Sequence, residues 1–309
     1  MAGIRRVSKL RQLVRLVRES HAVPMTGEPK LPGAIGPGEL GVTFLGHSSF
    51  LLRLAGRAVL VDPVFAKRLV VLRRARRVGV EMENLPPIDV VLLSHAHMDH
   101  LNRPTLKQVA RQTRLQTGRA PVAVVPRGVE DLVDTLGFAE VRTLDRWEST
   151  TVAGLRVTLT PAKHWGARIF SDTHRGFGGY VIEGEGHRVY HSGDTAYFDG
   201  FREIGRRLHP QVALVPIGAY FPDTHRSVHT SPEEALDGFV DLGADVMVAM
   251  HFGTFRLGRE PMEEPPIRLM ADARRRGLES RVRVLGEGET LVVAPVAGDV
   301  LAEPASNIA

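Results

Sequence analysis

The chain has 309 residues, of which 43% are hydrophobic and 24% charged, a balance typical of a globular protein with a full core. It contains no cysteine, which excludes disulfides and thiolate ligands, so any metal site must use histidine and carboxylate side chains. No apolar run approaches the 18 residues of a membrane-spanning helix, and the N-terminus lacks the apolar stretch of a secretory signal. We therefore expect a cytoplasmic location.

The net charge of +5 is concentrated in two segments. Residues 1–20 carry six basic side chains against the single acid Glu19, and residues 67–77 carry six basic side chains and no acid. Such clusters suit an anionic surface or substrate, although a solvated helix face and a basic loop explain them equally well. Because the clusters lack interleaved aromatic residues, nucleic acid is not an expected partner.

The N-terminal segment predicts a basic amphipathic arm. Residues 4–17 place apolar side chains at helical spacing, opposite a basic face. Such a helix can lie on an anionic membrane, or it can dock on the body of the protein or on a partner chain, and we favour docking. Residues 22–40 are rich in glycine and proline and indicate an extended linker. These features divide the chain into an arm (1–39), a domain (40–295) and a tail (296–309).

Short apolar runs separated by turn residues predict strands and helices through the domain. Strands are expected at 41–45, 49–54, 58–61, 88–93, 122–125, 139–144, 150–161 (a pair), 178–190 (a hairpin), 212–216, 245–250 and a last pair around 286–288. Helices are expected at 104–114, 128–136, from 232 onward and at 263–276. This alternation favours sheets covered by helices.

The densest chemical signal directly follows the strand at 88–93. Three histidines and an aspartate occur there within six residues: His95, His97, Asp99 and His100. Because His95 and His97 are two residues apart, they point to one face of an extended backbone, as zinc ligands would. Asp99 and His100 can bind a second ion, because the two ions of a dinuclear site lie about 3.5–4 Å from each other. A polar turn with chance histidines is the alternative, and it is improbable for a chain with 13 histidines.

Other predicted strand ends also carry a histidine or an aspartate: His47, Asp62, His164, Asp194 and His251. Each has a structural explanation when taken alone, such as a turn, a strand cap or a packed histidine–tryptophan pair. A carboxylate at Asp62 can orient a metal-bound imidazole, and one at Asp194 can bridge two cations. His229 precedes a helix with a strong start signal, at an end suited to anions.

The segment His95-Ala96-His97-Met98-Asp99-His100 resembles the His-x-His-x-Asp-His signature of the metallo-β-lactamase superfamily. The resemblance implies a four-layer αββα sandwich with a one- or two-metal hydrolytic site. Further stretches between residues 41 and 270 resemble the branch typified by N-acyl-phosphatidylethanolamine phospholipase D, among them Gly46-His47-Ser48-Ser49-Phe50, Pro161-Ala162-Lys163-His164-Trp165, Pro216-Ile217-Gly218-Ala219-Tyr220 and His251-Phe252-Gly253-Thr254-Phe255.

The resemblance also implies roles for single residues. The first zinc would be held by His95, His97 and His164. The second would be held by Asp99, His100 and His251, with Asp194 bridging the two. Asp99 and His229 are the expected catalytic residues, His47 and Asp62 are expected to support the ligands, and Tyr220 and Arg226 are expected to bind substrate. Three departures from the family pattern lie near the site: Phe221-Pro222-Asp223, Phe252 and Ala196.

The expected function is hydrolysis of a phosphodiester of the phospholipase D type by a hydroxide that bridges two zinc ions. Histidine and aspartate ligands also accept manganese or iron. A lactonase or amidase on the same metal core is the alternative, and a non-catalytic module that binds metal and docks on membranes is a third hypothesis. The expected partner is a small or phospholipid-like anionic substrate. Residues 1–20 would make a peripheral membrane contact or a homodimer contact.

Overall fold

The computed structural model describes residues 14–22, 24–169 and 172–296, and two seven-stranded sheets dominate it. The first sheet has the order β16 (Thr290–Val293), β1 (Leu40–Gly46), β2 (Ser49–Leu54), β3 (Arg57–Val61), β6 (Val90–Leu92), β7 (Val122–Pro126) and β8 (Glu140–Leu144). The second has the order β15 (Val282–Arg283), β14 (Val246–Met250), β13 (Val212–Pro216), β12 (His187–His191), β11 (Gly179–Gly184), β10 (Leu155–Thr160) and β9 (Ser149–Val152).

Each sheet is antiparallel at one side and parallel at the other. In the first sheet, β16 to β3 pair antiparallel and β3 to β8 pair parallel. In the second, β9 to β12 pair antiparallel and β12 to β15 pair parallel. Because ligand sites gather at the carboxyl ends of parallel strands, both sheets offer such an end to a common site.

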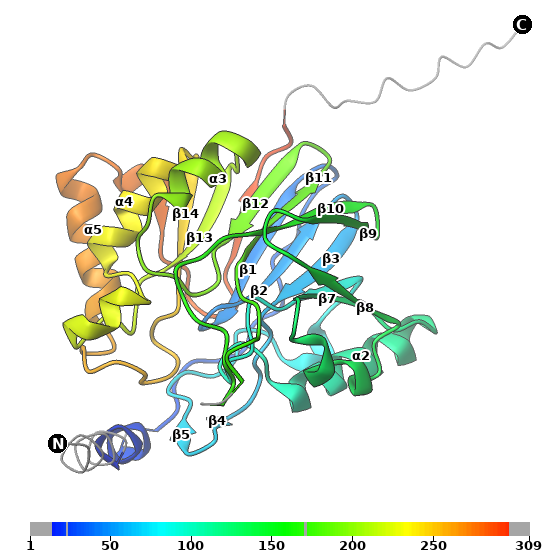
Figure 1. Cartoon of the computed structure of the whole chain (residues 1–309), viewed down its shortest axis with the longest axis horizontal. Coiled ribbons are helices and arrows are strands. Elements are labelled where there is room, and N and C mark those ends of the chain that lie inside the picture. Colours follow the sequence, from blue (N-terminus) through cyan, green and yellow to red (C-terminus); the bar gives the residue numbers. More distant parts are fainter. Residues whose placement is uncertain (1–13, 23, 170–171, 297–309) are drawn as a thin grey trace, which may run out of the picture.

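The helices cover the outer faces of the two sheets, as Figure 1 shows. Helix α2 (Arg103–Thr117) packs on the first sheet, and α3 (Gly200–Leu208), α4 (Pro232–Leu242) and α5 (Glu264–Arg275) pack on the second. Strand β6 illustrates how the layers form, since Val90 and Leu92 join the core between the sheets while Val91 packs toward α2. The predicted αββα sandwich is thus confirmed.

Short 3-10 turns occur at Met82–Asn84, Glu130–Leu132, Asp134–Leu136, Asp223–Ser227 and Glu279–Arg281. Two of these replace the α-helix predicted at 128–136, which was wrong. The segment begins and ends at Gly128 and Gly137, both at positive φ, and it buries the β-branched Val129 and Val133. Because this segment is short and β-branched residues disfavour an α-helix, it forms single 3-10 turns instead.

In the C-terminal half, the structure differs from the sequence prediction at two further places. The last strand pair predicted around 286–288 is wrong, because β15 and β16 belong to different sheets and the chain crosses between them. Helix α3 was not predicted, since Gly200 and Gly205 weaken its helical pattern. The structure explains Gly205, because a Cβ there would lie 2.1 Å from the carbonyl oxygen of Leu242 in α4.

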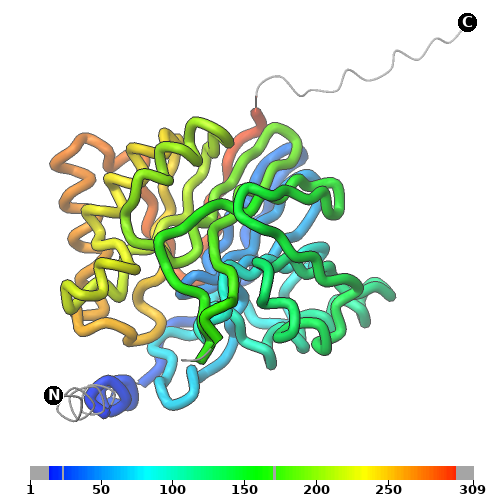
Figure 2. Tube along the Cα trace, viewed as in Figure 1, coloured from blue at the N-terminus to red at the C-terminus, as the bar shows by residue number. Residues whose placement is uncertain are grey.

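The described end of the N-terminal arm lies against the body of the protein (Figure 2). Residues 14–22 are helical, with Leu16 buried. Ser20 accepts a hydrogen bond from the main chain of Arg73, and Glu19 pairs with Arg256 at 3.4 Å. Arg73 belongs to a small hairpin of β4 (Arg68–Leu69) and β5 (Leu72–Arg73). This agrees with the predicted docking for these residues, while residues 1–13 lie outside the described part.

Candidate metal centre

The predicted ligands and the predicted supporting residue His47 converge at one end of the sandwich, each from a loop at the end of a strand. His47 lies in the turn between β1 and β2, and the His95–His100 segment follows β6. His164, Asp194 and His251 follow β10, β12 and β14 of the other sheet. The site is therefore built from both sheets, which is why residues more than 150 positions apart in the chain meet there.

Three of the residues at this site have an unusual backbone. His47, Asp62 and His251 have φ values of 60°, 44° and 60°, in the left-handed region that side chains other than glycine rarely occupy. The main chain of His251 donates to the carbonyl of His47 at 2.8 Å, and that of His47 donates to Oγ1 of Thr254 at 2.7 Å. Such strain persists where surrounding contacts hold it, commonly at functional sites.

The first group of potential ligands consists of His95, His97, His164 and Asp194, whose ligand atoms all lie within 4.8 Å of one another. Nδ1 of His97 lies 2.8 Å from Nε2 of His95 and 3.2 Å from Nε2 of His164. Three ring nitrogens at this spacing suit lone pairs that point at one cation.

The second group consists of His47, Asp99, His100 and His251. Oδ2 of Asp99 lies 2.9 Å from Nε2 of His47, 3.5 Å from that of His251 and 3.6 Å from that of His100. The sequence predicted a supporting role for His47, and the structure places it close enough to Asp99 to hold that carboxylate in position.

Asp194 lies between the two groups. Its carboxylate oxygens lie 3.1 Å from Nε2 of His251, 3.3 Å from Nε2 of His100 and 4.0 Å from Nε2 of His164. The structure thus brings all seven predicted metal ligands together, with Asp194 where a bridging carboxylate would lie.

Three buried polar atoms at the centre have no hydrogen-bond partner among the described residues and face the other ligands: Nε2 of His100 and of His251, and Oδ1 of Asp194. An unpaired buried polar group costs about 1–3 kcal/mol, so several at one place need a common explanation. Metal ions coordinated by these lone pairs would satisfy them. The donor set of imidazoles and carboxylates fits zinc, manganese or iron.

The outer ring nitrogens fix the orientation of three histidines. Nδ1 of His100 lies 2.7 Å from the Asp62 carboxylate, which also accepts from the main chain and hydroxyl of Ser94. Nδ1 of His164 lies 2.9 Å from the carbonyl of Val228, and that of His95 lies 2.9 Å from the Ser94 hydroxyl. Each contact leaves Nε2 facing the centre, as partners of metal-bound imidazoles do. Asp62 thus has the placement predicted for it.

The charges of the centre shift its pKa values in both directions. Burial lowers the pKa of His251, but Asp194 and Asp99 more than compensate and raise it to about 9. Burial likewise lowers the pKa of His100, and the same carboxylates together with Asp62 raise it well above its usual range. In contrast, burial lowers the pKa of His164 to about 4. Without a metal, the centre therefore holds protons on His100 and His251, where a cation would replace them.

A cavity of about 470 Å³ opens next to the cluster. Its lining includes His97, Met98, Asp99, Trp165, Ala167, Arg168, Ile169, Asp194, His229 and Leu257. Both predicted catalytic residues therefore face it, and Nδ1 of His229 lies 3.8 Å from Asp194. Burial lowers the pKa of His229 well below its usual range, so its imidazole is neutral at pH 7.

Tyr220 and Arg226, the predicted substrate-binding residues, face a different cavity of about 270 Å³. The Tyr220 hydroxyl donates to Glu264 at 2.7 Å, and Arg226 pairs with Glu234 at 2.5 Å. The structure does not bring these two side chains to the cavity beside the metal cluster, and both have protein partners.

The sequence analysis assigned no place in a substrate cavity to four residues of its wall, namely Trp165, Arg168, Ile169 and Leu257. Trp165 and Ile169 are exposed, and the Trp165 ring lies 4.4 Å from that of His97. The available signal was proximity in sequence, because Trp165 to Ile169 directly continue the loop that carries His164.

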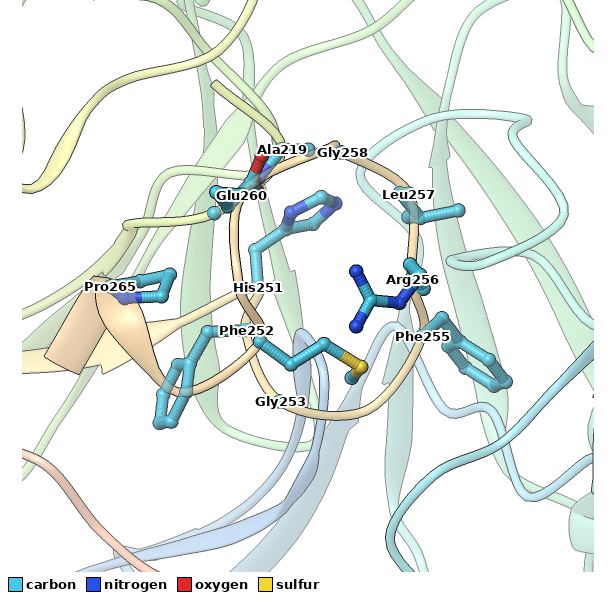
Figure 3. A pocket seen from close by; sticks show the side chains of 12 residues that line it. Ala219, His251, Phe252, Gly253, Phe255, Arg256, Leu257, Gly258, Glu260 and Pro265 are labelled. Carbon is cyan, nitrogen blue, oxygen red and sulfur yellow. Dashed lines mark hydrogen bonds between the residues drawn. The ribbon is translucent and has the colours of Figure 1, made fainter. Parts of the chain in front are cut away.

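The loop after β14, which carries His251, forms another side of the metal centre. Figure 3 shows His251 and Arg256 pointing to the inside of this loop, with Ala219 and Glu260 beside them. The Glu260 carboxylate accepts from the main chain of Ala219 at 2.5 Å and of Phe221 at 3.2 Å. These bonds tie the loop after β14 to the loop after β13 and so fix the position of His251.

Known proteins agree with this architecture. The sequence profile of the Beta-lactamase superfamily domain matches residues 57–252. A UPF0173 metal-dependent hydrolase of Rubrobacter xylanophilus is 32% identical over 81% of this chain and 95% of its own length. The N-acyl-phosphatidylethanolamine-hydrolyzing phospholipase D 1 of Caenorhabditis elegans is 32% identical over 71% of this chain and 65% of its own length.

An uncharacterised protein of Mycobacterium tuberculosis is 36% identical over 76% of this chain. The chain spans 64% of that protein's length, so it covers less than two thirds of both the mycobacterial and the nematode relative. Among solved structures, the metallo hydrolase Igni18 of Ignicoccus hospitalis superposes with a TM-score of 0.64 and 26% identity, over 83% of this chain and 99% of its own. Together these matches show that the chain belongs to the metallo-β-lactamase superfamily.

Proposed function

We propose that this chain is a dinuclear zinc phosphodiesterase of the phospholipase D type. The observation that carries the proposal is the position of Asp194 between two groups of potential ligands. The relatives named as N-acyl-phosphatidylethanolamine-hydrolyzing phospholipases D, from C. elegans and from Saccharomyces cerevisiae, support the substrate class.

Two sets of residues would hold the ions. His95, His97 and His164 would bind one ion, and Asp99, His100 and His251 the other, with Asp194 shared. When bound, two zinc ions supply a water of lowered pKa near pH 7 and stabilise negative charge on phosphoryl oxygens.

The remaining chemistry falls to the side chains that face the cavity. Hydrolysis adds water across a P–O bond: phosphorus takes the oxygen of water, its bond to the ester oxygen breaks, and the departing alcohol keeps that oxygen and gains a proton. The pKa of Asp99 lies well below its usual range, because His100, His251 and His47 outweigh the effect of burial. It therefore stays anionic and can orient the attacking water as a hydrogen-bond acceptor. The neutral imidazole of His229 can donate its N–H to a phosphoryl oxygen or to the leaving group.

The test combines metal content with activity. We expect about two metal ions per wild-type chain, by mass spectrometry of protein purified without chelator, and hydrolysis of bis(p-nitrophenyl) phosphate. Asp194→Asn should lose metal and activity together. Hydrolysis of lactones or amides without any turnover of phosphodiesters would reject the proposed substrate class. The chain would then be a lactonase or amidase that uses the same metal site.

We also propose a peripheral membrane contact, at a different place from the predicted residues 1–20. Val70 and Val71 at the tip of the β4–β5 hairpin are 73% and 45% exposed. The flanking Arg68 and Arg73 make no ion pair among the described residues. Leu69 and Leu72 of the hairpin belong to one apolar cluster with Leu257, which lines the metal cavity. Apolar side chains between cations suit an anionic lipid surface. Among the described residues, no helix is both long and apolar enough to cross a bilayer.

A further inference from the structure

Arg168 is a partly buried cation in the wall of the metal cavity. Its Nη1 group donates to the carbonyl oxygens of Ala96 at 2.9 Å and Leu101 at 3.0 Å. These carbonyls belong to the loop that carries His95, His97, Asp99 and His100. The two bonds therefore fix the guanidinium against the metal-binding loop. Because carbonyls are neutral, these bonds do not neutralise its charge, and Asp172 attracts it without forming an ion pair.

Arg175, on the same segment of chain, shows the contrast. It pairs with the carboxylates of Asp131 and Asp172, each at 2.5 Å, and does not line the cavity. Arg168 has no such ion pair among the described residues. A partly desolvated cation without a carboxylate partner is unfavourable unless a ligand supplies the negative charge.

The guanidinium also has donors to spare. It carries five N–H groups in a planar fork, and the bonds to Ala96 and Leu101 both use Nη1. Nε and Nη2 form the edge that binds two oxygens of a phosphate or carboxylate together. Trp165, Ile169 and Leu257 line the same cavity and offer it an apolar wall.

We propose that Arg168 binds the anionic group of the substrate while Trp165, Ile169 and Leu257 bind an apolar substituent. This inference rests on the proposed phosphodiesterase function and makes Arg168 the residue that selects charged esters. A phosphodiester monoanion with an apolar substituent fits the site, whereas a neutral ester or lactone leaves the guanidinium unpaired.

The test compares two substrates with the same leaving group and different charge. Bis(p-nitrophenyl) phosphate is a monoanion, and its methyl triester is neutral. For metal-loaded Arg168→Met, we expect kcat/KM to fall about ten- to hundredfold for the diester, the loss typical of a charged hydrogen-bonded contact. The triester rate should stay within about threefold of wild type. Arg168→Lys should recover part of the diester rate, because it keeps the charge without the fork.

Arg103→Met is the matched control. Arg103 lies close enough to influence the pKa of Arg168 but does not line the cavity. The Arg103→Met variant loses the same positive charge as Arg168→Met. An unchanged diester rate in Arg103→Met would therefore show that Arg168 acts by direct contact with the substrate rather than through the long-range electrostatic field. An equal loss in Arg103→Met would overturn the proposal.

Two further outcomes would also overturn the proposal. One is an unchanged diester rate in Arg168→Met. The other is an equal loss for diester and triester at normal metal content, which would show that Arg168 only supports the metal-binding loop. If wild type turned over no diester, the proposed function would fail by itself. The inference is then decided by binding of diphenyl phosphate, followed through tryptophan fluorescence. At least tenfold weaker binding by metal-loaded Arg168→Met supports it, and equal binding rejects it.

Discussion

The Asp62 carboxylate holds Nδ1 of His100 at 2.7 Å, which turns Nε2 of His100 toward Asp194 and Asp99. Asp62 is fully buried and is itself held by two hydrogen bonds from Ser94. A carboxylate that is fixed on one side and bonded to an imidazole on the other sets both the orientation and the tautomer of that imidazole.

Asp62→Asn should therefore weaken binding of the second metal ion by about 10- to 100-fold. The amide keeps the shape but loses the charge that favours a proton on Nδ1. Metal affinity is measured by competition with a chromophoric chelator. Asp89→Asn is the control, since Asp89 also accepts a main-chain hydrogen bond at 2.9 Å, from Ala58, outside the centre. Equal metal affinity in wild type and Asp62→Asn would show that His100 needs no orienting partner.

Metal binding should release protons. His251, with a pKa of about 9, and His100, with a raised pKa, are protonated at pH 7 in the metal-free protein. A ligating imidazole must be neutral, so a bound metal ion displaces these protons, and the metal affinity should rise as the pH increases from about 7 toward 9. Titration calorimetry in buffers of different ionisation enthalpy measures the release. His251→Gln should release fewer protons than wild type, and net proton uptake would contradict the assignment.

The hydroxyl of Thr254 should stabilise the strained turn at His47. Its oxygen accepts from the buried main-chain N–H of His47 at 2.7 Å. Thr254→Val keeps the shape and leaves that N–H unpaired, so we expect a loss of about 1–3 kcal/mol in the free energy of unfolding. Thr254→Ser keeps the hydroxyl and loses one methyl, which costs about 1 kcal/mol. Urea unfolding measures both variants, and a loss confined to Thr254→Ser would assign the role of Thr254 to packing rather than to its hydrogen bond with His47.

Much of the centre could be predicted because its signals are local. A buried strand followed by His95, His97, Asp99 and His100 places these ligands at a strand end whatever the rest of the chain does. The match of further strand ends to a known family then supplied Asp194 and His251. Strand positions followed from short apolar runs bounded by turn residues, a pattern that depends only on neighbouring residues.

Other features depend on contacts between distant segments and had no local signal. The basic segment 67–77 suggested an anionic partner or a solvated loop, yet Arg74 is buried. Its guanidinium donates to the carbonyls of Leu45, Val64 and Arg76. The separation of β15 and β16 into different sheets follows from how the sandwich closes, and the place of Arg168 follows from the path of the loop after His164. None of these can be deduced from spacing along the chain.

Tyr220→Phe and Arg226→Gln distinguish the sequence expectation from the structural arrangement. The sequence predicts that both residues bind substrate, whereas the structure pairs them with Glu264 and Glu234 in another cavity. We expect kcat/KM for bis(p-nitrophenyl) phosphate to stay within about threefold of wild type in both variants, since a half-exposed ion pair contributes about 0–1 kcal/mol. A tenfold loss in either would restore its predicted role in substrate binding.

The β4–β5 hairpin should bind anionic vesicles. The double variant Val70→Asp with Val71→Asp removes apolar area and adds repulsion, so co-sedimentation with phosphatidylglycerol-containing vesicles should fall to the level seen with neutral phosphatidylcholine. Leu115→Asp with Ile267→Asp is the matched control, because these residues are 75% and 67% exposed on α2 and α5 and the charge change is the same.

Each anionic-lipid contact of a basic side chain contributes about 1 kcal/mol, so Arg68→Gln and Arg73→Gln should each weaken binding about fivefold. Binding that survives the hairpin variant but is lost on deleting residues 1–20 would return the membrane contact to the N-terminal arm.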